Sequence, residues 1–205
     1  TGVLTWKGMD VTRFRDDPQL EAGGIFVYVR DLTHRRLWSS GQQPTITAPD
    51  YYDASFSIDR VELKRRDGAV ETVTEIVVSP EHPAEVRRIT VTNHGDQAID
   101  LDVTSYTEPV LATRGADVAH RAFSSMFLEV ELLADRGAVL VRRRPRSQSE
   151  SESWLVQVLT PDGEGFGEAE LDASRSEFLG RGGSLEKPRA LAFDHQLSGT
   201  GGDVL

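Results

Sequence analysis

Apolar and polar residues alternate in short runs along much of this chain. The two clearest runs are 85–93 and 99–108, which flank a polar turn at 94–97. Alternation with a period of two points successive side chains to opposite faces, so both runs predict half-buried β-strands. Further strands are expected at 25–29, 70–78, 128–132, 138–141 and 154–159.

Turn-forming residues separate these predicted strands. Asp67 and Gly68 tolerate the positive φ that a two-residue hairpin loop needs. The polar segments 79–83 and 160–163 contain Pro and are expected to end their strands. Before the hairpin, one continuous alternation is expected through Ala54, Phe56, Ile58, Val61 and Leu63.

The rest of the pattern adds one more strand and little helix. Leu191 and Phe193 are expected to mark a strand near the end of the chain, and 116–127 is expected to hold about one helical turn. Residues 147–153 are rich in Ser and Glu and predict a polar loop. Recurrent short strands with turns between them predict an all-β antiparallel sandwich or barrel.

The composition excludes several classes of function. The 205 residues suffice for one large β domain or two small ones. Cysteine is absent, which excludes disulfides and thiolate metal sites. The formal net charge of -10 repels phosphate backbones, so a nucleic acid is not expected as a partner. No apolar run reaches membrane-spanning length, and we expect a soluble, cytoplasmic domain.

Neither the histidines nor the acidic residues predict a catalytic centre. The five histidines lack the spacing of a metal site and are interpreted as surface or turn residues. Asp100, Asp102 and Glu108 alternate with apolar residues, so a solvated strand face is favoured over acid–base chemistry. The glycines of 180–183 predict a turn rather than a phosphate-binding loop.

The strongest candidate binding residues are basic. An acidic chain concentrates four positive charges within five residues, at Arg142, Arg143, Arg144 and Arg146. Guanidinium groups suit phosphate, carboxylates and sugar hydroxyls. The alternative interpretation is a strand end whose arginines pair with neighbouring acids.

A second candidate is the segment that contains Trp38 and Gln43. An exposed indole can stack on a sugar ring, and an amide can hydrogen-bond to its hydroxyls. Core packing of Trp38 is the alternative and is slightly favoured.

Several motifs, in one order, resemble the N-terminal domain of the family 94 glycoside phosphorylases, formerly glycosyltransferase family 36. The T-S-Y-x-E-x-x-L run stands at 104–111, and a D-x-A-H-x-A-F-S run stands at 117–124 with Arg121 where the family usually has Pro. Other similar segments are 11–17, with Phe14 in place of Trp, 24–31, 37–39 with 43–44, 143–147, and 175 with 178–182. The domain form found in cyclic β-1,2-glucan synthases is the most similar.

The resemblance implies a fold and a domain organisation. It implies that 1–205 is a single N-terminal domain, a large antiparallel β-sandwich (a supersandwich of galactose-mutarotase type) that is cut before its last strands. In the family, a helical linker and an (α/α)6 barrel follow, and the barrel carries the general acid Asp. No catalytic residue is therefore expected in this chain.

The resemblance also implies an activity for a longer parent enzyme. That enzyme would cleave a β-glucosidic bond with inorganic phosphate and invert the anomeric centre, releasing α-glucose 1-phosphate, with no other cofactor. In a glucan synthase this reaction would trim the linear chain and set the ring size. A stand-alone carbohydrate-binding or interaction sandwich is the alternative, and a self-contained mutarotase-like enzyme is a third possibility.

Partners and location follow from the same resemblance. The expected partners are a β-glucan oligosaccharide and the barrel of the same polypeptide, while a homodimer and an inner-membrane location of the parent stay open. The candidate residues Trp38, Gln43, Arg142, Arg143, Arg144 and Arg146 are expected to face the barrel. In this chain they should therefore be partly exposed and poorly paired.

Overall fold

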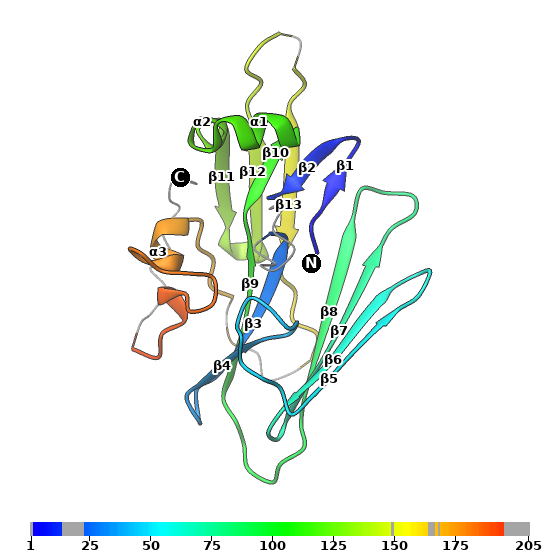
Figure 1. Cartoon of the computed structure of the whole chain (residues 1–205), viewed down its shortest axis with the longest axis vertical. Helices are drawn as coiled ribbons and strands as arrows, with labels where there is room; N and C mark the ends of the chain where they lie inside the picture. The colour runs from blue at the N-terminus through cyan, green and yellow to red at the C-terminus, as the bar shows by residue number, and fades with distance from the viewer. Residues whose placement is uncertain (1, 14–22, 149, 164–166, 168, 195–205) are drawn as a thin grey trace.

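The computed structural model describes residues 2–13, 23–148, 150–163, 167 and 169–194, and strands dominate it (Figure 1). These strands form four antiparallel sheets. The first sheet has the order β1 (Thr5–Trp6), β2 (Met9–Thr12) and β10 (Pro109–Ala112), and the second has β4 (Arg36–Ser39), β3 (Ile25–Asp31) and β9 (Leu101–Thr107). The third sheet contains β5 (Tyr51–Phe56), β6 (Val61–Asp67), β7 (Val70–Val78) and β8 (Glu85–Asn93). The fourth contains β11 (Leu128–Leu133), β12 (Ala138–Arg143) and β13 (Ser153–Val158). The predicted all-β class is confirmed.

Strand β3 lies at the centre of the packing because its two faces contact two different layers. Phe26 and Tyr28 face one side, where they pack with Tyr106 of β9 and with Phe178 and Leu191. Val29, one position along, faces the other side and packs with Trp38 of β4 and Val70 of β7. Strand β3 is therefore buried on both faces, in keeping with its run of apolar residues at 25–29.

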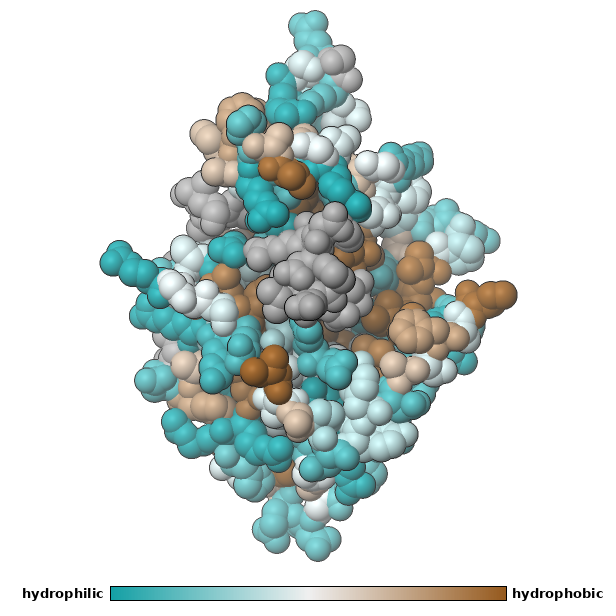
Figure 2. Space-filling model, viewed as in Figure 1, coloured by the Kyte–Doolittle hydropathy of each residue, from teal (hydrophilic) through white to brown (hydrophobic). Residues whose placement is uncertain are grey.

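The four-stranded sheet β5-β6-β7-β8 extends away from this centre and leaves its far end open (Figure 1). The turn between β5 and β6 interrupts the expected alternation, because Ser57 closes a hydrogen-bonded turn onto Arg60. Phe56 is 76 % exposed and Ile58 is 108 % exposed as a result. Figure 2 shows brown side chains gathered over this end of the sheet within a largely teal surface.

The predicted hairpin forms one residue later than expected. Gly68 has a φ of 63° and, with Ala69, makes the two-residue loop, while Asp67 pairs with Val70 as the last residue of β6. The side chain of Asp67 is fully engaged by a buried Arg65, which holds it in the strand. The left-handed position therefore falls to glycine, the residue that adopts it without strain.

One further prediction is confirmed and another is wrong. The runs 85–93 and 99–108 form the strands β8 and β9, as predicted; β8 pairs with β7 and β9 pairs with β3, so the turn between them crosses from one sheet to another. Leu191 ends a one-turn 3-10 helix at Arg189–Leu191 and is buried against Phe178, so the predicted last strand is wrong.

The helices are short. Around the region 116–127, where about one helical turn was expected, the structure has two helices, α1 (Arg114–Ala119) and α2 (Arg121–Ser125), which cap one end of the strands (Figure 1). A third helix, α3 (Arg175–Leu179), ends at Gly180 and is followed by the predicted glycine turn. In the described residues, no helix combines the length and apolarity that crossing a bilayer requires.

The buried side chain of Arg65 fastens the four-stranded sheet to the segment that follows β4. Its Nε and Nη2 donate to the two carboxylate oxygens of Asp67 at 2.6 and 3.0 Å. Its remaining donors reach the carbonyl oxygens of Gly41 and Thr47 at 2.9 and 2.8 Å. Arg65 is 0 % exposed, so every one of these bonds replaces lost hydration.

Replacing Asp67 by Asn should lower the free energy of unfolding by about 3 kcal/mol, because it leaves the Arg65 charge buried without its counter-ion. Urea denaturation followed by tryptophan fluorescence measures this loss. Lys64→Gln is the matched control on the same strand, since Lys64 forms a partly exposed pair with Glu71 at 3.2 Å and its loss should cost less than about 1 kcal/mol. Equal losses in the two variants would contradict the role given to Arg65.

Candidate functional site

The arginine cluster divides between the two faces of the sheet β11-β12-β13. Successive residues of β12 point to opposite sides, so Arg142 faces solvent while Arg143 is buried at 6 % exposure. Arg143 donates from Nη1 to the carbonyl oxygens of Ser124 and Val110, at 3.0 and 3.3 Å. Burial, and to a smaller extent the nearby charge of Arg146, lower the pKa of Arg143. We conclude that Arg143 is a packing residue that ties α2 and β10 to this sheet.

The other three arginines of the cluster each pair with a carboxylate. Arg142 pairs with Glu129 at 2.9 Å and with Glu152 at 3.2 Å. Arg144 pairs with the same Glu129 at 2.9 Å, and Arg146 pairs with Glu150. The expectation that these arginines are poorly paired is therefore wrong. The partner carboxylates lie across the sheet or in a tight loop. The run of arginines in the sequence therefore does not by itself identify them.

Trp38 and Gln43 lie elsewhere, on and after β4. Trp38 is 1 % exposed and packs in the core with Val29 and Val70. The core-packing interpretation of Trp38 is confirmed, and the expected partial exposure is wrong for this residue. Gln43 is half-buried in the segment that follows β4. The structure therefore does not bring the two candidate groups, on β4 and β12, into one sheet.

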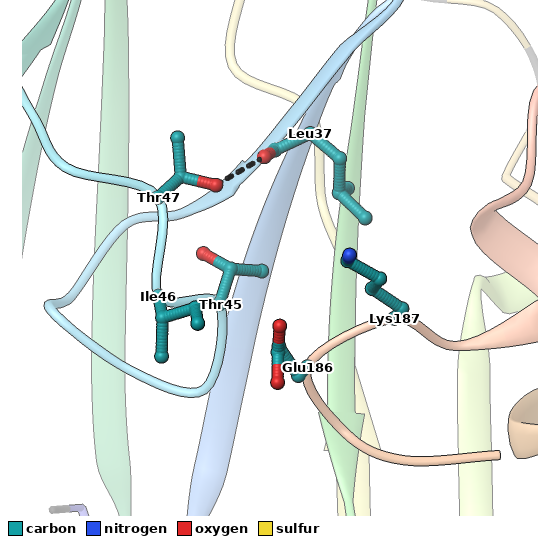
Figure 3. Close-up of a pocket in the computed structure, with 6 residues that line it drawn as sticks. All are labelled: Leu37, Thr45, Ile46, Thr47, Glu186 and Lys187. Carbon is teal, nitrogen blue, oxygen red and sulfur yellow. Dashed lines mark hydrogen bonds between the residues drawn. The ribbon is translucent and has the colours of Figure 1, made fainter.

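A small pocket opens beside this segment. Its volume is about 240 Å³, and Figure 3 shows the side chains that line it: Leu37, Thr45, Ile46, Thr47, Glu186 and Lys187. The hydroxyl of Thr47 donates to the Leu37 carbonyl oxygen at 3.0 Å, so its proton is already used within the fold. Leu37 points into the pocket while the neighbouring Trp38 points into the core, as alternation along β4 requires.

A surface that the sequence analysis missed lies on the exposed side of β11-β12-β13. Glu129, Arg142 and Trp154 stand directly opposite one another on the three strands. Trp154 is 52 % exposed, and the Arg142 guanidinium lies 5.6 Å from its ring centroid. We call this surface the Trp154 face, and it comprises Glu129, Glu131, Leu140, Arg142, Trp154 and Val156. Only the cross-strand register brings these residues together, because the sequence of 153–158 does not show that the side of the strand with Trp154 is the exposed one.

A buried carboxylate joins four of the motifs that carry the family resemblance. Glu108 is 8 % exposed and accepts from Tyr106 at 2.8 Å, from Arg175 at 2.9 Å and from Arg13 at 3.1 Å. Arg13 also contacts Asp117 of α1 at 3.5 Å. We call this cluster the Glu108 network. The solvated-face interpretation is therefore wrong for Glu108, while Asp102 of the same series pairs with Arg30 across β3 and β9.

The charge of Glu108 is held by its partners. Burial by itself raises the pKa of Glu108, but the hydrogen bond and charge of Arg175, helped by Arg13 and the Tyr106 hydroxyl, outweigh it, so its pKa lies below the usual value. Burial and the nearby Glu108 raise the pKa of Tyr106, so its hydroxyl remains a donor. A carboxylate held ionised between two guanidinium groups stabilises structure and is unsuited to donating a proton.

Glu108→Gln should lower the free energy of unfolding by about 3 kcal/mol at pH 7, because two partly buried arginines lose their counter-ion. The folded-state pKa is depressed, so this contribution is complete above the unfolded glutamate value of about 4.3 and is lost as the pH falls below it. Denaturant titrations from pH 7 to pH 3 should therefore show the gap between wild type and variant closing. Glu177→Gln, at an exposed position on α3, should leave stability nearly unchanged; a gap that stays constant with pH would refute the assignment.

Comparisons with known proteins agree with this architecture. The family model described as "Glycosyl hydrolase 94, supersandwich domain" matches residues 1–205. The cyclic beta-(1,2)-glucan synthase NdvB of Rhizobium meliloti (strain 1021) is 32% identical over 204 residues, which cover 100% of this chain and 7% of that protein. Solabiose phosphorylase of Paenibacillus borealis is 20% identical over 171 residues, 81% of this chain and 20% of that protein. The chain thus spans only a small part of both relatives, and it belongs to glycosyl hydrolase family 94 as a supersandwich domain.

Proposed function

We propose that this chain is a non-catalytic domain of a longer enzyme that phosphorolyses β-glucosidic bonds and controls chain length in the synthesis of cyclic β-1,2-glucan. The observation that carries the proposal is the 32% identity to a cyclic β-1,2-glucan synthase along the whole chain. The second relative is a phosphorylase, which supports the type of reaction.

The Glu108 network supports a structural role for the residues that carry the family resemblance. Glu108 and Asp117 are 8 % and 4 % exposed, so neither carboxylate is open to a substrate. Asp117 lies on α1, and the partners of the two carboxylates come from the segment after β2, from β9 and from α3. These residues therefore hold the domain together, and the proposal leaves the chemistry to another part of the polypeptide.

The proposed reaction needs a donor of protons and a phosphate nucleophile. A phosphate oxygen attacks the anomeric carbon from the face opposite the glycosidic oxygen, and the bond to that oxygen breaks. The departing oxygen takes a proton from a carboxylic acid, which the proposal places in the barrel of the same polypeptide. The products are α-glucose 1-phosphate and a glucan shorter by one unit.

The longer polypeptide, incubated with linear β-1,2-glucan and inorganic phosphate, should release α-glucose 1-phosphate, whereas the 205-residue chain should release none above the buffer blank. An enzyme-coupled assay of glucose 1-phosphate makes the measurement, and omission of phosphate is the control. Turnover by this chain alone that a point substitution within it abolishes would contradict the non-catalytic role. A longer polypeptide that leaves every β-glucan intact in the presence of phosphate would contradict the reaction.

A further inference from the structure

The Trp154 face places an exposed tryptophan in line with charged side chains of two neighbouring strands. Glu129, Arg142 and Trp154 form one row across three strands. Neighbouring strands lie about 4.8 Å apart, so this row spans roughly 10 Å, the reach of more than one sugar ring. The next row along the strands holds Glu131, Leu140 and Val156. The side of this face on β11 is therefore acidic and the side on β13 is apolar, with Arg142 and Leu140 between them.

Trp154 is held in place before any ligand arrives. The guanidinium of Arg142 lies 5.6 Å from the indole centroid, which restricts the ring through a cation–π contact. Arg142 is restricted in turn by Glu129 and Glu152. Trp154 nevertheless remains 52 % exposed. A rigid aromatic surface of this kind suits the apolar face of a pyranose, because little rotamer freedom is lost on binding.

The charges of this face favour a ligand without charge. Arg142 and Arg144 are balanced by Glu129 and Glu152, which lie within 3.2 Å of them. Glu131 adds a further exposed carboxylate. An anion such as phosphate would have to displace these carboxylates, whereas a sugar hydroxyl both donates and accepts and can bond beside an ion pair without breaking it.

We propose that the Trp154 face is a binding site for a β-linked glucan chain, in which Trp154 stacks on one pyranose and the charged side chains of the row bond to its hydroxyls. This inference rests on the proposed function for the identity of the glucan. It assigns the site a role in holding a polymer away from the reacting bond. Val156 and Leu140 would meet the CH-rich faces of the following sugar.

The three tryptophans provide the test, because Trp38 is buried whereas Trp6 and Trp154 are exposed on different strands. In an NMR titration with linear β-1,2-glucan oligosaccharides, the indole N–H signal of Trp154 should shift and saturate, while that of the buried Trp38 should not move. Trp154→Ala should weaken binding roughly tenfold or more, as expected when a stacked aromatic surface is lost. Trp6→Ala is the matched control, since Trp6 is 41 % exposed and also lies against a cation, Lys7.

Four outcomes would overturn the proposal. One is an unmoved Trp154 signal at millimolar oligosaccharide; another is an equal loss of affinity in the two tryptophan variants. The third is a Trp154 signal that inorganic phosphate shifts and the oligosaccharide does not, which would make the face an anion site. The fourth is protection of Trp154 from acrylamide quenching in the longer polypeptide together with no glucan binding by either protein, which would show that another part of the polypeptide covers the face. Release of glucose 1-phosphate is measured separately, so failure of this site and failure of the proposed function are distinguishable.

Discussion

The arrangement of this domain depends on the hydrogen bonds and ion pairs that the buried carboxylate of Glu108 makes. It lies where β9 passes into β10, and it bonds to side chains from segments as distant in sequence as Arg13 and Arg175. Beside it, Tyr106 stacks on Phe178 with ring centroids 4.5 Å apart, so the ionic and apolar contacts share one location. A buried charge of this kind is stable only with all its partners present, and it therefore links the docking of α1 and α3 to the correct pairing of β9.

The strands were predictable from sequence because the information that defines them is local. The run 70–78 is found as β7 with both predicted ends, since alternation of neighbouring residues is enough to identify it. The partner of each strand was not predictable in the same way. Nothing in the run 85–108 reveals that β8 and β9 belong to different sheets, because pairing depends on residues far away in the chain. Leu191 was misassigned for a related reason: it is apolar because it packs on Phe178, in a one-turn helix.

The candidate residues followed the same division. A series of arginines in the sequence suggests an anion-binding site only as long as the carboxylates that pair with them are unknown. Glu129 is 13 positions from Arg142 in sequence yet directly opposite it across the sheet. Trp38 and Trp154 differ likewise: each has a serine beside it in the sequence, Ser39 and Ser153, but one is in the core and the other on the surface, at 1 % and 52 % exposure. Burial is a property of the assembled layers, and residue type alone does not determine it.

The opposite orientations of Arg142 and Arg143 set a limit on how β12 can change over evolution. Arg143 fits a buried position lined by Ser124 and Val110, and Arg142 fits a surface position beside Trp154. Inserting or deleting one residue in the turn Ala134–Arg136 would shift the pairing of the strand by one residue, so Arg142 would point inward and Arg143 outward. Arg142 would then be turned into the interior, away from the carboxylates of Glu129 and Glu152. The row of Glu129, Arg142 and Trp154 on the outer surface would be lost. Length variation in this turn is therefore expected only in steps of two residues, although the turn itself is exposed.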